Sequence, residues 1–164
     1  MPAFDPIEES RKQWIAHGWT DEAPGMTLVT SIMRAHQLLL GRVDRTLRPF
    51  ELTFSRYEVL QLLSFTKRGS LPMNKITRRL QVHATSTTNS VDRLEKAGLV
   101  ARRPHPTDGR TTLIEITEAG RDLAAQATHA LNADVFSSPG LPADALDDLL
   151  SGLTDLRSGL DDHH

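Results

Sequence analysis

The chain has 164 residues, of which 38% are hydrophobic and 24% charged, and its net charge is −2. This composition is ordinary for one globular domain with appended elements. The absence of cysteine excludes disulfides, thiolate zinc sites, catalytic thiols and cysteine-based oxidant sensors. No segment reaches the roughly 20 apolar residues that cross a bilayer, and residues 1–11 lack the apolar core of a signal peptide. We therefore expect a soluble, cytoplasmic protein with no membrane contact.

Basic residues gather in the middle of the chain. The segment Lys67–Arg110 contains ten basic and three acidic residues, a net charge of +7, whereas the rest of the chain has −9. A basic middle between acidic ends is typical of a local surface that binds a polyanion. A solvated basic face without a partner is the alternative, and charge alone does not decide between them.

Two helices are expected before the basic segment. Residues 5–18 predict a short helix, and residues 26–47 predict a long one, because apolar residues recur there every three or four positions. Pro49 ends the long helix. The candidate buried positions of the short helix are Ile7, Trp14 and Ile15. The stripe of the long helix comprises Val29, Ile32, Met33, His36, Leu39, Leu40, Val43 and Leu47.

The middle of the chain predicts three more helices. Thr53 or Ser55 can cap the first of them, whose inner face comprises Phe54, Tyr57, Leu60 and Leu63. After a minimal strand at residues 70–71, residues 73–80 and 84–97 predict two helices that the turn Gln81–His83 separates. Gly98 is the expected C-terminal cap of the last one.

A β-hairpin and a helical pair complete the chain. Residues 99–103 and 111–116 predict strands around a loop with prolines, Asp108 and Gly109. Thr117 is the expected cap of the next helix, whose stripe comprises Leu123, Ala127, Ala130 and Leu131. Prolines and a glycine at 139–142 separate it from a last helix with near-heptad leucines, which predicts a helix–helix seam. These leucines are Leu146, Leu149, Leu150, Leu153, Leu156 and Leu160.

The second helix of the predicted helix-turn-helix begins with unusual side chains. These are Thr85, Ser86, Thr87, Thr88 and Asn89. Short hydroxyl and amide side chains let a helix approach base edges closely and hydrogen bond to bases and phosphates. They are poor helix formers, so a functional reason is favoured over the alternative that they are caps and exposed fillers.

The order of these elements is that of a winged helix-turn-helix, and the residues resemble the MarR (multiple antibiotic resistance regulator) family. The resemblance lies in Asn89–Leu99, read as N-S-V-D-R-L-E-K-A-G-L, in Asp108-Gly109-Arg110, and in Thr117 seven residues further on. It implies a mostly α-helical fold with a small β-hairpin wing in an intertwined homodimer. Residues 1–52 and 118–164 would dimerise, and residues 53–117 would bind DNA.

The resemblance also implies roles for single residues. Thr85 to Asn89 and Arg93 would face the major groove, and Arg110 would reach from the wing towards the minor groove. Asp108, followed by Gly109, would hold the wing loop by pairing with a basic neighbour. The candidates for phosphate contacts are Lys75, Arg78, Arg79, Arg102 and Arg103. A two-fold dimer would bind an inverted repeat with half-sites about 10 bp apart, as a repressor without metal or cofactor.

Family members often respond to an aromatic acid or phenol. The extra N-terminal helix with Trp14 resembles a branch that binds urate-like anions, and that resemblance places Glu58, Ser90 and Arg102 at the ligand. Ser90 stands where the branch has Arg and Glu58 where it has Asp, which argues against urate and leaves another organic acid. His36 is a further candidate, although a histidine on an apolar stripe is more often part of the core.

Two other classes of function fit the sequence less well. No His-x-x-x-His pair, nucleophile elbow or glycine-rich phosphate loop is present, so we do not expect an enzyme. A winged-helix module that binds another protein, with an incidental basic segment, is the alternative. His83 and His105 fall on the predicted DNA face, and His163 and His164 receive no role.

Overall fold

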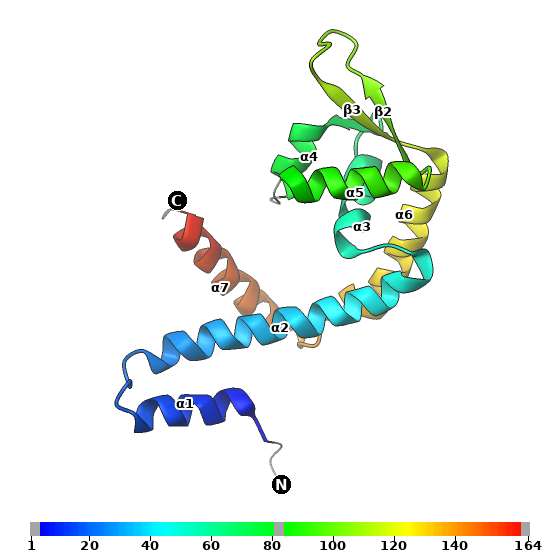
Figure 1. The fold of residues 1–164 in the computed structure, drawn as a ribbon. Coiled ribbons are helices and arrows are strands. Elements are labelled where there is room, and N and C mark those ends of the chain that lie inside the picture. Colours follow the sequence, from blue (N-terminus) through cyan, green and yellow to red (C-terminus); the bar gives the residue numbers. More distant parts are fainter. Residues whose placement is uncertain (1–3, 81–83, 162–164) are drawn as a thin grey trace.

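The computed structural model describes residues 4–80 and 84–161 (Figure 1). The predicted turn Gln81–His83 and the terminal His163 and His164 lie outside the described residues. The helices are α1 (Pro6–Ala16), α2 (Ala23–Leu47), α3 (Phe54–Ser64), α4 (Met73–Leu80), α5 (Ala84–Lys96), α6 (Glu118–Leu131) and α7 (Ala143–Asp161), with a 3₁₀ turn η1 (Arg48–Phe50) and a π-helical turn η2 (Asn132–Phe136). The strands are β1 (Ser70–Pro72), β2 (Val100–Pro104) and β3 (Thr112–Ile116).

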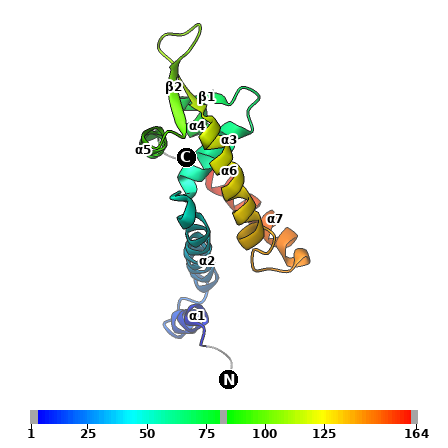
Figure 2. The ribbon, with the colours of Figure 1, turned by 90° about the vertical axis from the view of Figure 1, so that its right-hand side faces the viewer.

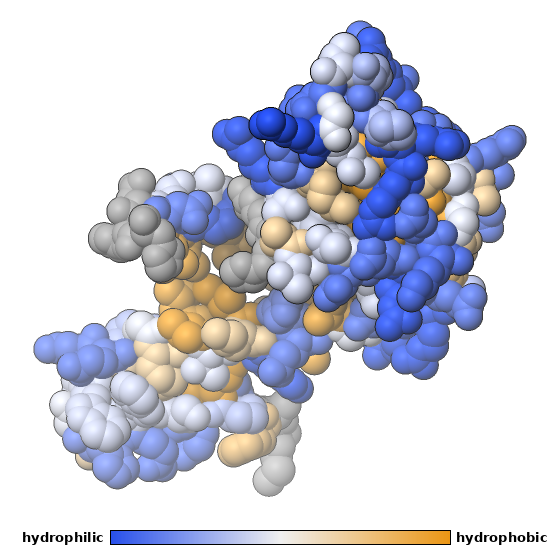
Figure 3. All heavy atoms as spheres, turned by 45° about the horizontal axis from the view of Figure 1, so that its top comes forward, coloured by the Kyte–Doolittle hydropathy of each residue, from blue (hydrophilic) through white to orange (hydrophobic). Residues whose placement is uncertain are grey.

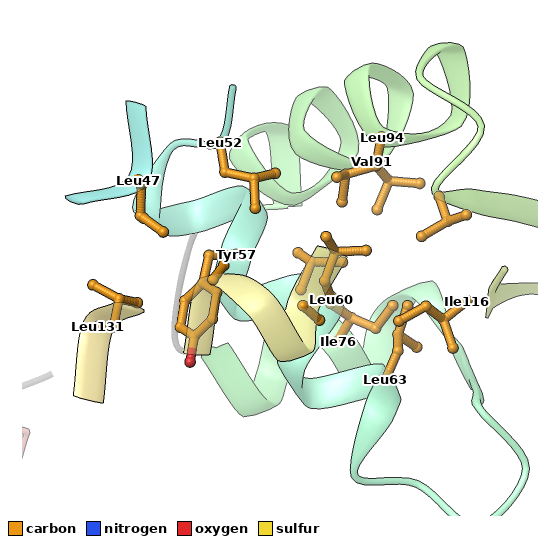
Figure 4. Close-up of a cluster of buried hydrophobic side chains, with 14 of the residues drawn as sticks. Leu47, Leu52, Tyr57, Leu60, Leu63, Ile76, Val91, Leu94, Ile116 and Leu131 are labelled. Atoms are coloured by element: carbon orange, nitrogen blue, oxygen red, sulfur yellow. The ribbon is translucent and has the colours of Figure 1, made fainter. Parts of the chain in front are cut away.

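The core lies where α3, α4, α5 and the sheet pack against α6 and the end of α2. Figure 4 shows these side chains pointing towards one another, and most of them are fully buried. They include Leu47, Leu60, Leu63, Ile76, Val91, Leu94, Ile116 and Leu131. The predicted inner face of α3 is confirmed for Tyr57, Leu60 and Leu63, whereas Phe54 is only partly buried.

The sheet has three antiparallel strands in the order β1-β3-β2. The predicted hairpin corresponds to β2 and β3, which pair from Val100↔Ile116 to Pro104↔Thr112. The minimal strand joins the other edge of β3, with Leu71 opposite Ile114. Strand β1 thus satisfies main-chain groups of β3 that a two-stranded wing would leave open.

Local capping chemistry sets the ends of the helices as predicted. The Thr53 hydroxyl accepts a hydrogen bond from the Arg56 amide at 3.4 Å, and the Thr117 hydroxyl accepts one from the Gly120 amide at 3.1 Å. The Thr117 hydroxyl also donates to the Gly98 carbonyl oxygen at 2.8 Å. Gly98 has a φ of +72°, a conformation that glycine adopts without strain, so the chain can leave α5 and enter β2.

Much of the predicted apolar surface outside this core is exposed. Helix α1 buries no residue, so the prediction that Ile7, Trp14 and Ile15 are buried is wrong for the single chain. Of the α2 stripe only Val43 and Leu47 are buried, and α7 buries none of its leucines. Figure 3 shows apolar side chains gathered in the hollow between α7 and the arm formed by α1 and α2. The sequence patterns predict apolar faces correctly, but none of the helices and strands in the described part of the chain covers them.

The molecule is extended, with the wing at one end and α1 at the other (Figures 1 and 2). Helix α2 joins the α1 end to the lobe that contains the sheet, and α6 returns from that lobe alongside α2. Among the described residues, no helix is long and apolar enough to cross a membrane.

Candidate nucleic-acid interface

Helix α5 presents a polar outer face opposite its buried one. Val91 and Leu94 point into the core, as predicted. Thr85 and Asn89 are four residues apart, and Lys96 follows seven residues later, so these three exposed side chains lie on one face. Lys96 was not among the predicted contacts. Its spacing from Asn89 is the signal that could have identified it.

The prediction that Thr87 faces outward is wrong. Thr87 is only 1% exposed, because it lies on the same side of α5 as Val91 and Leu94. Ser90 is also buried, and its hydroxyl oxygen lies 3.3 Å from that of Ser55 on α3. A run of hydroxyl residues covers every side of a helix, so only part of this run can face DNA.

The other predicted contacts of α5 are exposed and lie beside its outer face. Ser86 and Arg93 are on the flank towards α3, where Arg93 lines a shallow pocket together with Arg56. Thr88 is on the flank towards the wing, and its hydroxyl donates to the Ala84 carbonyl oxygen at 3.0 Å.

The wing loop is held by Asp108. Its carboxylate accepts a hydrogen bond from the Thr111 hydroxyl at 2.7 Å and from the Arg110 amide at 3.0 Å. These bonds, the Thr111 bond foremost, lower the pKa of Asp108. The structural role of Asp108 is as predicted, but its partners are a hydroxyl and a main-chain amide, whereas a basic side chain was expected. Arg110 is exposed directly after Gly109 and extends the loop with a positive charge.

Arg102, a predicted phosphate contact, is paired with two carboxylates of α5 in this structure. Its guanidinium donates to Asp92 at 2.5 Å and also to Glu95, both on α5, while the Glu95 carboxylate accepts the Arg102 amide at 3.2 Å. The bond to Asp92, with that to Glu95, raises the pKa of Arg102. Two carboxylates neutralise this cation, so it ties β2 to α5. Arg103 is exposed, with its Nε 3.9 Å from a Glu115 carboxylate oxygen.

The remaining predicted phosphate contacts lie on α4. Lys75, Arg78 and Arg79 are exposed, while Ile76 is buried. Helix α4 and strand β2 of the wing both pack against α5, so the two elements that carry these cations adjoin it (Figure 1). A helix bearing short polar side chains between two groups of cations can enter a groove while the cations contact phosphates.

The predicted effector residues do not form one site within the chain. Trp14 packs against Trp19 with ring centroids 5.2 Å apart, on the α1 arm. Arg102 is held by α5, and Ser90 by Ser55. Glu58 is half-buried, and burial raises its pKa. The urate-type arrangement is therefore not supported.

His36, another effector candidate, lines an apolar pocket. The pocket has a volume of about 320 Å³ and lies between α2, the start of α3 and the link after α6. Its other lining residues are Leu39, Leu40, Val43, Phe54, Val135, Phe136 and Pro139.

A helix-turn-helix whose second helix is exposed beside an antiparallel wing defines a winged helix-turn-helix protein. A family model described as "MarR family" matches residues 50–111. Sco5413, a MarR family transcriptional regulator from Streptomyces coelicolor, is 49% identical, with a TM-score of 0.76 over 85% of this chain and 96% of that one. This chain therefore belongs to the MarR family of transcriptional regulators, which agrees with the prediction that it is not an enzyme.

Two further relatives are more distant. Sco3205 from Streptomyces coelicolor, solved in complex with DNA, is 25% identical, with a TM-score of 0.71 over 81% of this chain and 85% of that one. The transcriptional repressor IacR from Pseudomonas putida is 30% identical over 54% of this chain and 52% of its own length. The chain spans about half the length of the first curated relatives that it matches.

Proposed function

We propose that this chain is a transcriptional repressor that binds an inverted-repeat operator as a homodimer. Residues 53–117 bind DNA, and residues 1–52 and 118–164 dimerise. The observation that carries the proposal is the exposed face of Thr85, Asn89 and Lys96 on α5, beside a wing loop that ends in Arg110. Sco3205, which has the same fold, was solved with DNA.

The exposed apolar faces support the homodimer. Met33 on α2 is 61% exposed, and Leu149, Leu150 and Leu160 on α7 are similarly uncovered. Exposed apolar surface on two helices is costly in water, and a second copy of the chain covers it by two-fold pairing. The two α5 helices then face neighbouring major grooves, about 10 bp apart.

Fluorescence anisotropy tests the proposal. The probes are duplexes from the region upstream of the gene for this chain, with and without excess random DNA, at two salt concentrations. Binding by a dimer that resists competitor DNA is the expected result, with an affinity that falls as salt rises because phosphate contacts release counterions. Absence of salt-sensitive duplex binding would favour the alternative, a winged-helix module that binds another protein.

A small organic acid or phenol is the proposed effector class, and the apolar pocket at His36 is its proposed site. An apolar body fits the leucine and phenylalanine lining, and the imidazole supplies one polar contact. Aromatic acids titrated into the protein–DNA complex should release the DNA, and His36→Leu should reduce this response while leaving DNA affinity intact. An equal response from His36→Leu would contradict this assignment of the site.

A further inference from the structure

The direction of α7 depends on the short link that follows α6. Within the described residues, α7 has no extensive packing against another helix or strand of its own chain. Figures 1 and 2 show it projecting from the region where α6 ends beside α2. The link between α6 and α7 comprises residues 132–142. Contacts that hold this link in place therefore also set the direction of α7 and of its leucines.

The link begins with the π-helical turn η2. The Ser137 amide donates to the Asn132 carbonyl oxygen, five residues back, at 3.0 Å. A widened turn at a helix end leaves main-chain carbonyl oxygens that need other donors. The carbonyl oxygen of Asp134, within this turn, and that of Ser138, two residues after it, both lie at the side of α2.

Arg42 of α2 supplies those donors. Its guanidinium donates to the Ser138 carbonyl oxygen at 2.8 Å and also to the Asp134 carbonyl oxygen. One turn further along α2, the Thr46 hydroxyl lies 3.4 Å from the Asp134 carboxylate. On another side of the link, Val135, Phe136 and Pro139 line the apolar pocket that α2 also lines. A planar guanidinium with several fixed donors can hold two carbonyl groups at a set spacing, which a single ammonium group cannot do.

We propose that Arg42 is a positioning residue that sets the angle between α6 and α7, and through it the separation of the two α5 helices in the dimer. The effect on α6 and α7 stands on the hydrogen bonds of Arg42. The effect on α5 separation rests on the proposed function.

The first test measures the angle within one chain. Because the chain contains no cysteine, nitroxide labels can be attached at Glu118→Cys on α6 and Asp155→Cys on α7. Labelled chain is diluted with excess unlabelled chain, so that only the intrachain distance is measured. We expect a narrow distribution of distances between the two labels in the chain that retains Arg42. The distribution should be at least twice as broad in Arg42→Ala and of intermediate width in Arg42→Lys. Equal widths in all three would overturn the proposal.

Arg45→Ala is the matched control, because Arg45 is exposed on the same helix and lines the same surface at Asp134. It should leave the distribution narrow, and broadening equal to that of Arg42→Ala would contradict a specific role for Arg42. If Arg42→Ala does not fold, Arg42→Lys still tests the proposal. An unchanged width of its distance distribution would refute the proposal.

The second test measures operator spacing. The unsubstituted chain is first used to select a tightly bound duplex from a pool of random inverted repeats. Two altered duplexes are then made, in which the spacing between the half-sites is about one base pair longer or shorter. The unsubstituted chain should lose about tenfold in affinity on each altered duplex, and Arg42→Ala about twofold. If dimers of the unsubstituted chain and of Arg42→Ala lost the same affinity on the altered duplexes, the proposed effect of Arg42 on the separation of the α5 helices would be refuted. An intact dimer that binds no duplex would refute the proposed function and leave the distance measurement standing.

Discussion

Asn89 lies at the centre of the exposed face of α5, four residues after Thr85 and seven before Lys96. An amide side chain that hydrogen bonds a base edge in the major groove contributes about 1–3 kcal/mol of discrimination against the wrong base. Asn89→Ala should therefore reduce the preference for one base pair per half-site by roughly that amount, as measured by binding to singly substituted operators. Gln126→Ala, exposed on α6, serves as the control and should leave every preference unchanged.

Arg110 belongs to the wing loop that Asp108 holds. As an exposed cation beyond the helix-turn-helix, it should contact the DNA backbone or the minor groove, so its effect should depend little on sequence. We expect Arg110→Ala to weaken binding to all duplexes and to reduce the slope of log affinity against log salt by about one for each phosphate that Arg110 neutralises. Unchanged affinity and slope would show that the wing assignment is wrong.

At the scale of elements, Arg102 joins strand β2 of the wing to α5 through Asp92 and Glu95. Hydrogen bonds that involve charged groups contribute about 1.5–3 kcal/mol when well shielded, and partial exposure lowers this value. Arg102→Met should lower the free energy of unfolding by about 1 kcal/mol in urea denaturation. Arg103→Met, at a more exposed and longer ion pair, should have little effect on stability. If both substitutions lowered the free energy of unfolding equally, Arg102 would not be the more strongly held of the two arginines.

Gly120 permits the close approach of α6 to the chain between α5 and β2. A Cβ at this position would lie 2.1 Å from the Leu99 carbonyl oxygen and 2.9 Å from Ile116. Gly120→Ala should therefore destabilise the fold by about 2 kcal/mol or more, although alanine is the better helix former. Gly25 occupies the same third position of α2 with open space around it. Gly25→Ala should be neutral or slightly stabilising, and thermal unfolding distinguishes the two variants.

At the scale of the whole molecule, the exposed apolar faces of α2 and α7 form the proposed dimer interface. We expect that a chain starting at Met26 or ending at Pro139 is monomeric at concentrations where the full chain is dimeric, and that it binds the operator weakly. Light scattering after size-exclusion chromatography gives the mass of each. Full dimerisation of both truncated chains would refute this arrangement of the dimer.

The sequence by itself determined the helices, the hairpin and most of the polar residues that are exposed on α5. Helix periodicity, the caps at Thr53 and Thr117 and the glycine at 98 are local signals, because each depends on side chains and backbone groups a few residues apart. The same locality explains why the Asn89–Leu99 segment and the wing residues were enough to indicate the family. Lys96 could also have been placed on the outer face of α5 by its spacing from Asn89 alone.

Only the tertiary structure decided which residues of each predicted set are paired with distant side chains and which are exposed. Ser90 belongs to the run of polar residues on α5, and the packing of α3 places the Ser55 hydroxyl oxygen 3.3 Å from that of Ser90. Arg102 and Arg103 are adjacent, and only the position of α5 beside β2 brings two carboxylates to the first. Arg42 meets the Ser138 carbonyl across 96 residues of chain. Such contacts depend on which elements pack against one another in the folded chain. A periodic pattern describes one element only and does not say which distant element lies beside it.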